Sequence, residues 1–254
     1  MITIQDHGPV RELRLARPPA NALSPELVDA LAAALEQAPR DGARAIVLSG
    51  APGMFCAGLD VPLLLPFGRS GIYSMWRHLY GMLRALAAAK IPVAAAITGH
   101  SPAGGAVLAT YCDYRVMAEG NYKIGYNEVQ VGIPMPIAIL RCVARLVGDR
   151  QAERLCVGGL LLPAAEALRI GLIDEIVPAG QVVERAIEWC RAMTALPVTA
   201  MSRTREASRA GLVRLMDEGL AGELDQLVES WFHPEAQAVL HAVVERMAQK
   251  KKKE

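Results

Sequence analysis

The chain has 254 residues, 52% of them hydrophobic and 21% charged, and its 27 basic and 26 acidic side chains leave a formal net charge of +1. This length suits one α/β domain with a large core, and the balanced charge argues against nucleic acid as the main partner. Five scattered cysteines without a CxxC pair argue against a disulfide framework or a zinc site, and they favour a cytoplasmic location. No signal peptide is predicted, because the N-terminus lacks a basic stretch followed by a long apolar one. No bilayer-spanning segment is predicted either, because Lys90 and Pro92 interrupt one of the longest apolar stretches.

In chain order, apolar periodicity first predicts a hairpin from strands at residues 2–4 and 11–16. Ser24 followed by Pro25 is a typical helix start, so a helix is expected over residues 27–35. Further strands are predicted at residues 43–49, 91–98, 114–118, 122–124 and 172–177, and further helices at 72–89, after Gly104, and at 136–147, 149–157, 164–170 and 179–196. The alternation of strands and helices indicates a right-handed α/β core with parallel strands.

The end of the chain has a different pattern. Residues 197–249 are rich in Ala, Leu, Glu and Arg and are predicted to be entirely helical, packing on the core or on a neighbouring subunit. The lysines at 250–253 form a basic tail that is expected to be solvated rather than bound to phosphate.

Two short segments with small residues follow buried strands, FCAGLD at residues 55–60 and SPAGG at residues 101–105. Backbone N–H groups are exposed where a strand ends, and a helix N-terminus adds positive potential to the second segment. The N–H groups of Leu59 and Gly104 are therefore candidate donors to one oxygen anion, and two converging donors would form an oxyanion hole. The alternatives are a plain turn with Asp60 as the N-cap of the next helix, and tight helix packing at Gly104 and Gly105.

Glu128 is a lone carboxylate in an apolar neighbourhood, with Ile124, Val129, Val131 and Ile133 around it in the sequence. Apolar surroundings raise the pKa of a carboxyl group and make it a better proton shuttle near neutral pH. The alternative is an ordinary glutamate in the first turn of a helix, where the helix dipole favours a negative charge.

Taken together, the motifs resemble those of the crotonase superfamily, the enoyl-CoA hydratases and isomerases, over most of the chain. The matching segments occur in the family's order: NALS (21–24), FCAGLD (55–60), PAGG (102–105), LLPAAEA (161–167) and GLIDEIV (171–177). The resemblance implies an α/β fold with a crotonase-like ββα spiral core at residues 1–196, which carries the CoA-thioester site. It also implies a C-terminal helical trimerisation region at residues 197–254, and hence a homotrimer or a dimer of trimers.

The resemblance further assigns the oxyanion N–H groups to Leu59 and Gly104 and the proton shuttle to Glu128. The residues expected to contact the substrate are Cys56, Ala57, Gly58, Leu59, Asp60 and Gly104. The substrate is an acyl-CoA thioester, so CoA enters with it, and no separate cofactor, metal, nucleic acid or membrane partner is implied. Other candidates are weaker: Cys56 is expected to be a buried thiol rather than a nucleophile, and His78, His233 and His241 lack metal-ligand spacing.

One departure from the family pattern limits which of the family's reactions is expected. Hydratases of this family carry two catalytic glutamates, and the position of the first is Val107 here, whereas the second is retained as Glu128. Hydration needs a positioned water as well as a proton donor, but moving a double bond needs only one proton shuttle. The chain is most similar to mitochondrial-type Δ3,Δ2-enoyl-CoA isomerases, also in CDYR (112–115) and IGYNEVQVGI (124–133).

The resemblance therefore implies an isomerase that converts 3-enoyl-CoA to trans-2-enoyl-CoA in fatty-acid β-oxidation. The alternatives are an enoyl-CoA hydratase, another crotonase such as a thioester hydrolase or decarboxylase, and a non-catalytic acyl-CoA-binding member. The candidates for the acyl pocket are Trp76, Tyr80, residues 63–65 and Met135, all of which could equally be ordinary core positions.

Overall fold

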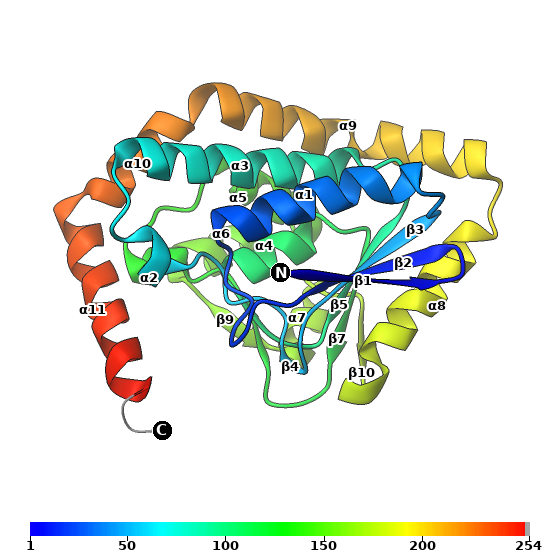
Figure 1. The fold of residues 1–254 in the computed structure, drawn as a ribbon, viewed down its shortest axis with the longest axis horizontal. Helices are drawn as coiled ribbons and strands as arrows, with labels where there is room; N and C mark the ends of the chain where they lie inside the picture. Colours follow the sequence, from blue (N-terminus) through cyan, green and yellow to red (C-terminus); the bar gives the residue numbers. More distant parts are fainter. Residues whose placement is uncertain (252–254) are drawn as a thin grey trace.

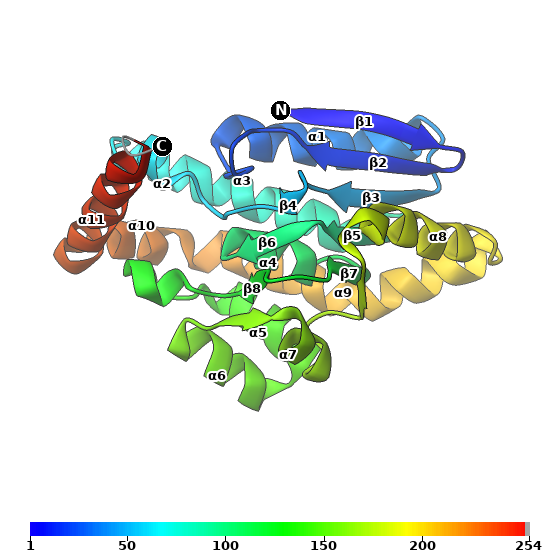
Figure 2. The same ribbon diagram turned by 90° about the horizontal axis from the view of Figure 1, so that it is seen from below.

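The computed structural model describes residues 1–251, and its main sheet has six strands in the order β1, β2, β3, β5, β7, β10. The first five follow one another down the view of Figure 2. Their bounds are β1 (Ile2–His7), β2 (Val10–Leu15), β3 (Ala45–Ser49), β5 (Val93–Ile97), β7 (Tyr114–Ala118) and β10 (Glu175–Val177). β1 and β2 form an antiparallel hairpin, and every later pair is parallel. The predicted hairpin and parallel α/β core are confirmed.

Helices cover both faces of this sheet, which explains why β3, β5 and β7 are buried along their whole length. On one face, α1 (Pro25–Arg40) and α3 (Arg69–Ala88) pack over the side chains of Ile46 and Leu48. On the other, α8 (Val182–Thr194) packs against Ala45 and Val47. Because side chains alternate along a strand, β3 contributes to both layers of the core. Ser24 caps α1 as predicted, its side chain accepting a hydrogen bond from the Leu27 N–H (3.3 Å).

A second, smaller sheet has the strand order β4-β6-β8-β9. Its strands have two to four residues each: β4 (Gly53–Met54), β6 (Gly99–Pro102), β8 (Lys123–Gly125) and β9 (Leu161–Pro163). Sequence patterns predicted β8 but not the other three, because such short strands leave no periodicity to detect. β4 and β6 come soon after β3 and β5 in the chain, so the small sheet keeps the two glycine segments side by side.

The remaining elements of the core are short helices: α2 (Val61–Leu64), α4 (Gly104–Thr110), α5 (Ile137–Val147), α6 (Asp149–Gly158), α7 (Ala164–Arg169) and the 3₁₀ turns η1 (Glu128–Val131) and η2 (Ala179–Gln181). The last strand is shorter than the predicted 172–177. Leu172 and Ile173 are buried, but their N–H groups bond to the Ala167 carbonyl at the end of α7. Their apolar character therefore reflects burial against the core and not a place in the sheet.

The C-terminal region consists of α9 (Val198–Gly222), α10 (Leu224–Phe232) and α11 (Pro234–Lys251). α9 runs beside α3 across the top of the view, whereas α11 stands at one end of the molecule next to α2 (Figure 1). The predicted basic tail ends in residues 252 and 253, which lie outside the described residues. Across residues 1–251, no helix combines the length and apolar character needed to span a membrane.

A buried ion cluster attaches α9 to the core. Asp113, which follows α4, accepts hydrogen bonds from Arg205 and Arg209 of α9 (2.9 Å each) and from the Val93 N–H at the start of β5 (2.8 Å). Both guanidinium groups are largely buried, and they also donate to backbone carbonyls, Arg205 to that of Ala89 and Arg209 to that of Tyr111. One carboxylate therefore compensates two cations that the fold has taken out of water.

We expect Asp113→Ala to lower the free energy of unfolding by about 3–5 kcal/mol, because it leaves two buried guanidinium groups without their counter-ion. Urea denaturation at neutral pH measures the loss. The matched control is Asp217→Ala, which removes the partner of Arg84 in an exposed ion pair (2.5 Å) and should cost less than about 1 kcal/mol. Equal losses in the two variants would show that the cluster does not stabilise the fold beyond a surface pair.

Candidate active site

The first glycine segment, residues 55–60, is held by three hydrogen bonds with residues 21–23. The Asn21 side-chain amide donates to the Phe55 carbonyl (3.0 Å). The Leu23 N–H donates to the Gly58 carbonyl (2.7 Å), and the Leu23 carbonyl accepts from the Asp60 N–H (3.1 Å). Because the groups on either side of it bond to Leu23, the N–H of Leu59 points the other way, as in a parallel bridge.

The second segment reaches the same place from the end of β6. Ala103, immediately before α4, has φ +47° and ψ −122°, a conformation that non-glycine residues rarely adopt. Its N–H donates to the Gly125 carbonyl (2.8 Å), and its carbonyl accepts from the Val107 N–H (3.0 Å). These bonds fix the direction in which the following N–H, that of Gly104, leaves the backbone.

The two segments touch at Gly58 and Gly104. A Cβ atom on Gly104 would lie 3.0 Å from the Gly58 Cα and 3.5 Å from its carbonyl carbon, which is bonded to the Leu59 nitrogen. A Cβ on Gly58, where φ is +87°, would lie 3.0 Å from the Gly104 nitrogen. Only residues without a side chain allow this approach, which brings the two candidate N–H groups close together. Neither N–H has an acceptor among residues 1–251.

The structural alternatives proposed for these segments hold as well. Asp60 caps α2, its Oδ1 accepting from the Leu63 N–H (3.1 Å). Gly105 is required for packing, since a Cβ there would lie 2.2 Å from the Cys56 carbonyl oxygen. The same backbone therefore forms the turn, allows the helix to pack closely and leaves the two N–H groups unbonded within residues 1–251, so the alternatives do not exclude one another.

Glu128 is the first residue of η1, which follows β8, and β8 pairs with β6 beside the second segment. The Tyr126 hydroxyl bonds to Thr110 Oγ1 at the end of α4 (2.5 Å). The Glu128 Oε2 is buried and has no hydrogen-bond partner in the described part of the chain. Burial away from water raises the pKa of this carboxyl from 4.5 to about 7, so it exchanges protons near neutral pH.

These groups meet in a cavity of about 300 Å³. Leu59, Gly104 and Glu128 all line it, and so does Val107. The other lining residues are mostly apolar: Ala20, Ala22, Ala57, Asp60, Val61, Pro62, Trp76, Leu79, Ala103, Asn127, Val131, Ile133, Pro136, Ile139, Val243 and Met247. The structure thus brings together the three residues singled out as chemically important, although 69 positions separate the first from the last.

Some expected contacts lie elsewhere. Of the six residues expected to touch the substrate, Cys56 and Gly58 are not on the cavity wall; Cys56 is fully buried, and burial raises its thiol pKa to about 12. Of the acyl-pocket candidates Trp76 lines the cavity, whereas the Tyr80 hydroxyl donates to Glu223 (3.1 Å) and Met135 lines a different surface hollow.

Sequence reasoning missed several cavity residues. Asn127 carries a buried Oδ1 without a partner among the described residues, and a polar side chain directly before Glu128 was a signal that could have found it. Val243 and Met247 come from α11, more than a hundred residues after Glu128. They look like any other apolar positions of a helix, so the sequence holds no signal that places them at the cavity.

Comparisons with known proteins agree on one family. Residues 5–253 match the profile described as enoyl-CoA hydratase/isomerase. Enoyl-CoA delta isomerase 1, mitochondrial, of Mus musculus is 33% identical and aligns with 98% of this chain and 88% of its own. A probable enoyl-CoA hydratase of Mycobacterium tuberculosis is also 33% identical, aligning with 89% of this chain and 86% of its own.

Among solved structures, human mitochondrial Δ3,Δ2-enoyl-CoA isomerase superposes with a TM-score of 0.94 at 30% identity, over 98% of this chain and 99% of that one. The crotonase-like fold expected from the motifs is therefore confirmed.

The buried carboxyl makes folding stability depend on pH. Its pKa is higher in the folded protein than the ordinary value of 4.5, so its contribution is fully present below pH 4.5 and is lost as the pH rises through about 7. We expect Glu128→Gln to remove this loss, so that the stability of the variant relative to the wild type improves by up to about 3 kcal/mol between pH 4.5 and pH 8.5. Urea denaturation of both proteins at the two pH values measures this change; a difference that is the same at both would refute it.

Proposed function

The chain belongs to the enoyl-CoA hydratase/isomerase family, whose members act on acyl-CoA thioesters, and we propose that it is a Δ3,Δ2-enoyl-CoA isomerase. One observation carries the proposal: among the described residues the cavity offers a single carboxylate without a partner, Glu128, and it has an aliphatic side chain, Val107, at the position of the first of the two hydratase glutamates. Asp60 also lines the cavity, but Arg17 (2.5 Å) and the Leu63 N–H (3.1 Å) occupy its oxygens.

The reaction starts when Glu128, as the carboxylate, removes a proton from C2 of a 3-enoyl-CoA. The electron pair of that C–H bond moves toward the thioester, which becomes a dienolate. The N–H groups of Leu59 and Gly104 donate hydrogen bonds to the dienolate oxygen. Glu128, now protonated, returns the proton to C4, which gives trans-2-enoyl-CoA and restores the carboxylate. CoA enters as part of the substrate, and the reaction uses no other cofactor.

The energetics of the site support this mechanism. Backbone donors already aimed at the developing charge do not have to reorganise, and each one typically contributes about 10²–10³ in rate. A base is most effective when its pKa is near the working pH, and burial raises that of Glu128 to about 7. The cavity lining is mostly apolar, and a proton shuttle between two carbons needs no bound water.

An enoyl-CoA hydratase is the second candidate, because probable hydratases are among the relatives. Hydration requires a group that positions and activates water, and Val107 offers neither a charge nor a hydrogen bond for this. Parallel spectrophotometric assays with 3-enoyl-CoA and 2-enoyl-CoA separate the two functions. Rapid consumption of the first with little consumption of the second supports the isomerase, and the reverse result supports the hydratase. Binding of acyl-CoA without turnover of either would indicate a non-catalytic member.

The wider role follows from this activity. Isomerisation of 3-enoyl-CoA prepares unsaturated acyl chains for fatty-acid β-oxidation. We further propose the organisation expected from the motifs, a core at residues 1–196 with the thioester site and a helical region at residues 197–254 that assembles the protein into a homotrimer or a dimer of trimers. The cavity itself is lined by residues from both regions.

Glu128→Gln keeps the shape of the side chain but removes the base, and general base catalysis typically contributes about 10²–10⁴ in rate. We therefore expect kcat for 3-enoyl-CoA isomerisation to fall by about that factor with little change in KM. The matched control is Glu36→Gln on the exposed surface of α1, which should leave both constants unchanged. Activity of the Glu128 variant within a few-fold of the wild type would rule out the assignment.

The pH dependence of kcat/KM gives an independent check. The base must be ionised to take the C2 proton, so activity is expected to reach a plateau at pH values well above the pKa of the base and to fall tenfold per unit well below it. The inflection should lie near 7, because burial raises the pKa of Glu128 to about that value. A profile that stays flat down to pH 5 would contradict a buried carboxyl as the base.

A further inference from the structure

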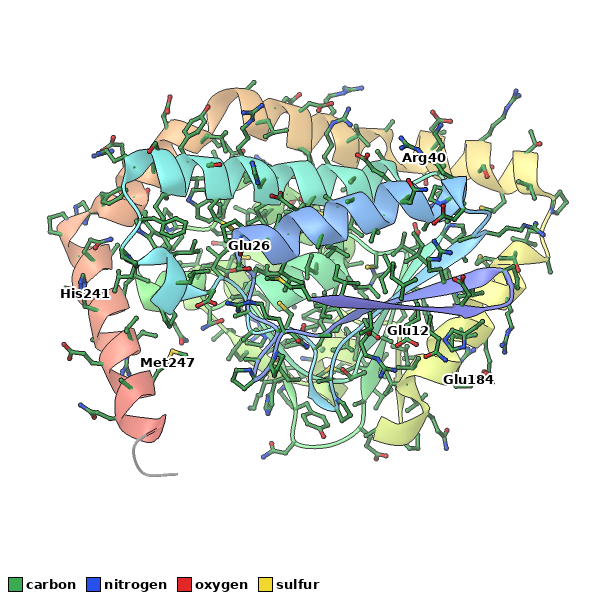
Figure 3. The ribbon with its side chains drawn as sticks, viewed as in Figure 1. Glu12, Glu26, Arg40, Glu184, His241 and Met247 are labelled. Carbon is green, nitrogen blue, oxygen red and sulfur yellow. The ribbon has the colours of Figure 1, made fainter. Side chains whose placement is uncertain are left out.

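The last helix, α11, forms one wall of the cavity although it belongs to the C-terminal region. Figures 1 and 2 both show it at one end of the molecule, beside α2 and after α10. Val243 and Met247, which are four residues apart and therefore share one face of the helix, both line the cavity. The side chain of Met247 lies on the side of α11 that is turned toward the rest of the molecule (Figure 3).

The first half of α11 is anchored to the turn that carries Glu128. Gly132, the C-cap of η1, lies so close to the helix that a Cβ there would be 2.7 Å from the Ala236 Cα. Ala236 and Leu240, both in the first half of α11, are buried. The Gln237 side chain also donates to the Trp231 carbonyl of α10 (2.7 Å). The position of the helix relative to the candidate base is therefore fixed at its beginning.

The second half of α11 is open to solvent. Met247 lines the cavity and is nevertheless 47% exposed, so it lies where the cavity meets water. An unbranched thioether side chain adapts its shape to what it touches. The cavity thus ends in a flexible apolar side chain and not in a rigid wall.

The polar and apolar parts of the cavity lie in different places along its lining. The two free N–H groups and Glu128 come from the segments after the strands, whereas α2, α3, α5 and α11 contribute only apolar side chains such as Trp76 and Ile139. A volume of about 300 Å³ is twice that of a cavity that holds benzene, roughly 150 Å³, and so has room for about a dozen carbon atoms. An acyl chain of that length fills the apolar part when its thioester is at the polar groups.

We propose that Val243 and Met247 of α11 bind the distal carbons of the acyl chain, and that Met247 thereby gives the protein its preference for chains of medium length. The proposal rests on the acyl-CoA substrate of the proposed function, but it does not depend on which reaction occurs. Short chains end before they reach α11, chains of about ten to twelve carbons lie against Met247, and longer ones pass it into water.

The test measures binding of hexanoyl-CoA and dodecanoyl-CoA to the full chain by calorimetry. Each buried methylene changes Kd by about fourfold, so loss of the apolar contact at the chain end is worth about tenfold or more. We expect Met247→Ser to weaken dodecanoyl-CoA binding at least tenfold and to leave hexanoyl-CoA binding within twofold. Met247→Leu, which keeps the apolar contact, should bind dodecanoyl-CoA about as well as the wild type. His241→Ala, at an exposed position of α11, should change the binding of neither compound.

Weakening that is equal for the two chain lengths would mean that the substitution disturbs α11 as a whole, and no weakening would mean that the chain does not reach it. Either result overturns the proposal, and so does a wild type that binds neither compound. Both ligands are saturated and cannot be isomerised. A wild type that binds them with the expected selectivity but converts no 3-enoyl-CoA would therefore refute the proposed function alone.

Discussion

The contact between Gly58 and Gly104 is the constraint on which the site depends. Two peptide groups from segments about 45 residues apart stand side by side here because neither residue has a Cβ, since a Cβ at either position would lie only 3.0 Å from the backbone of the other. The fold makes the contact possible because β3 and β5 are neighbours in the main sheet and β4 and β6 are neighbours in the small one. Donors built from backbone are held by the whole sheet, and their direction does not depend on a rotamer.

The carboxylates of the core are of two kinds: those with hydrogen-bond or ion-pair partners, which have a structural role, and Glu128, the proposed base. Asp113 binds two arginines, and Glu12, almost fully buried in β2, accepts from Ser49 (2.6 Å) and contacts His7 (3.2 Å). Hydrogen-bond and ion-pair partners offset the cost of burying these two groups. Glu128 has a buried oxygen without such a partner in the described part of the chain, and burial raises its pKa instead. The fold thus tolerates a destabilising carboxyl group in the cavity, where a proton acceptor is useful.

The sequence predicts those parts of the fold and of the candidate site whose signal lies within a few neighbouring residues. The cap at Ser24, the buried strand β3 and the glycine segments carry their signals within a few residues, so they were found with nearly correct bounds. The strands β4, β6 and β9 are defined only by their partners in the small sheet, and no short pattern shows them. The same holds for Val243 and Met247, whose place at the cavity depends on how α11 docks. Cys56 is the opposite case: it lies in the correct motif, but its side chain points into the core.

The packing of α11 links the proposed chain-length preference to the proposed base, because the same helix contacts the turn of Glu128 and lines the cavity. Its buried beginning touches Gly132 at the end of the turn that starts with Glu128, and its exposed end provides Met247. A substitution near Ala236 would therefore displace the base and the helix together, because backbone meets backbone there. Met247 lies about three helical turns after Ala236 along α11, and about half of it is exposed to water. Chain-length preference can thus change at the free end of the helix while the two N–H groups and Glu128, which the core holds, keep their geometry.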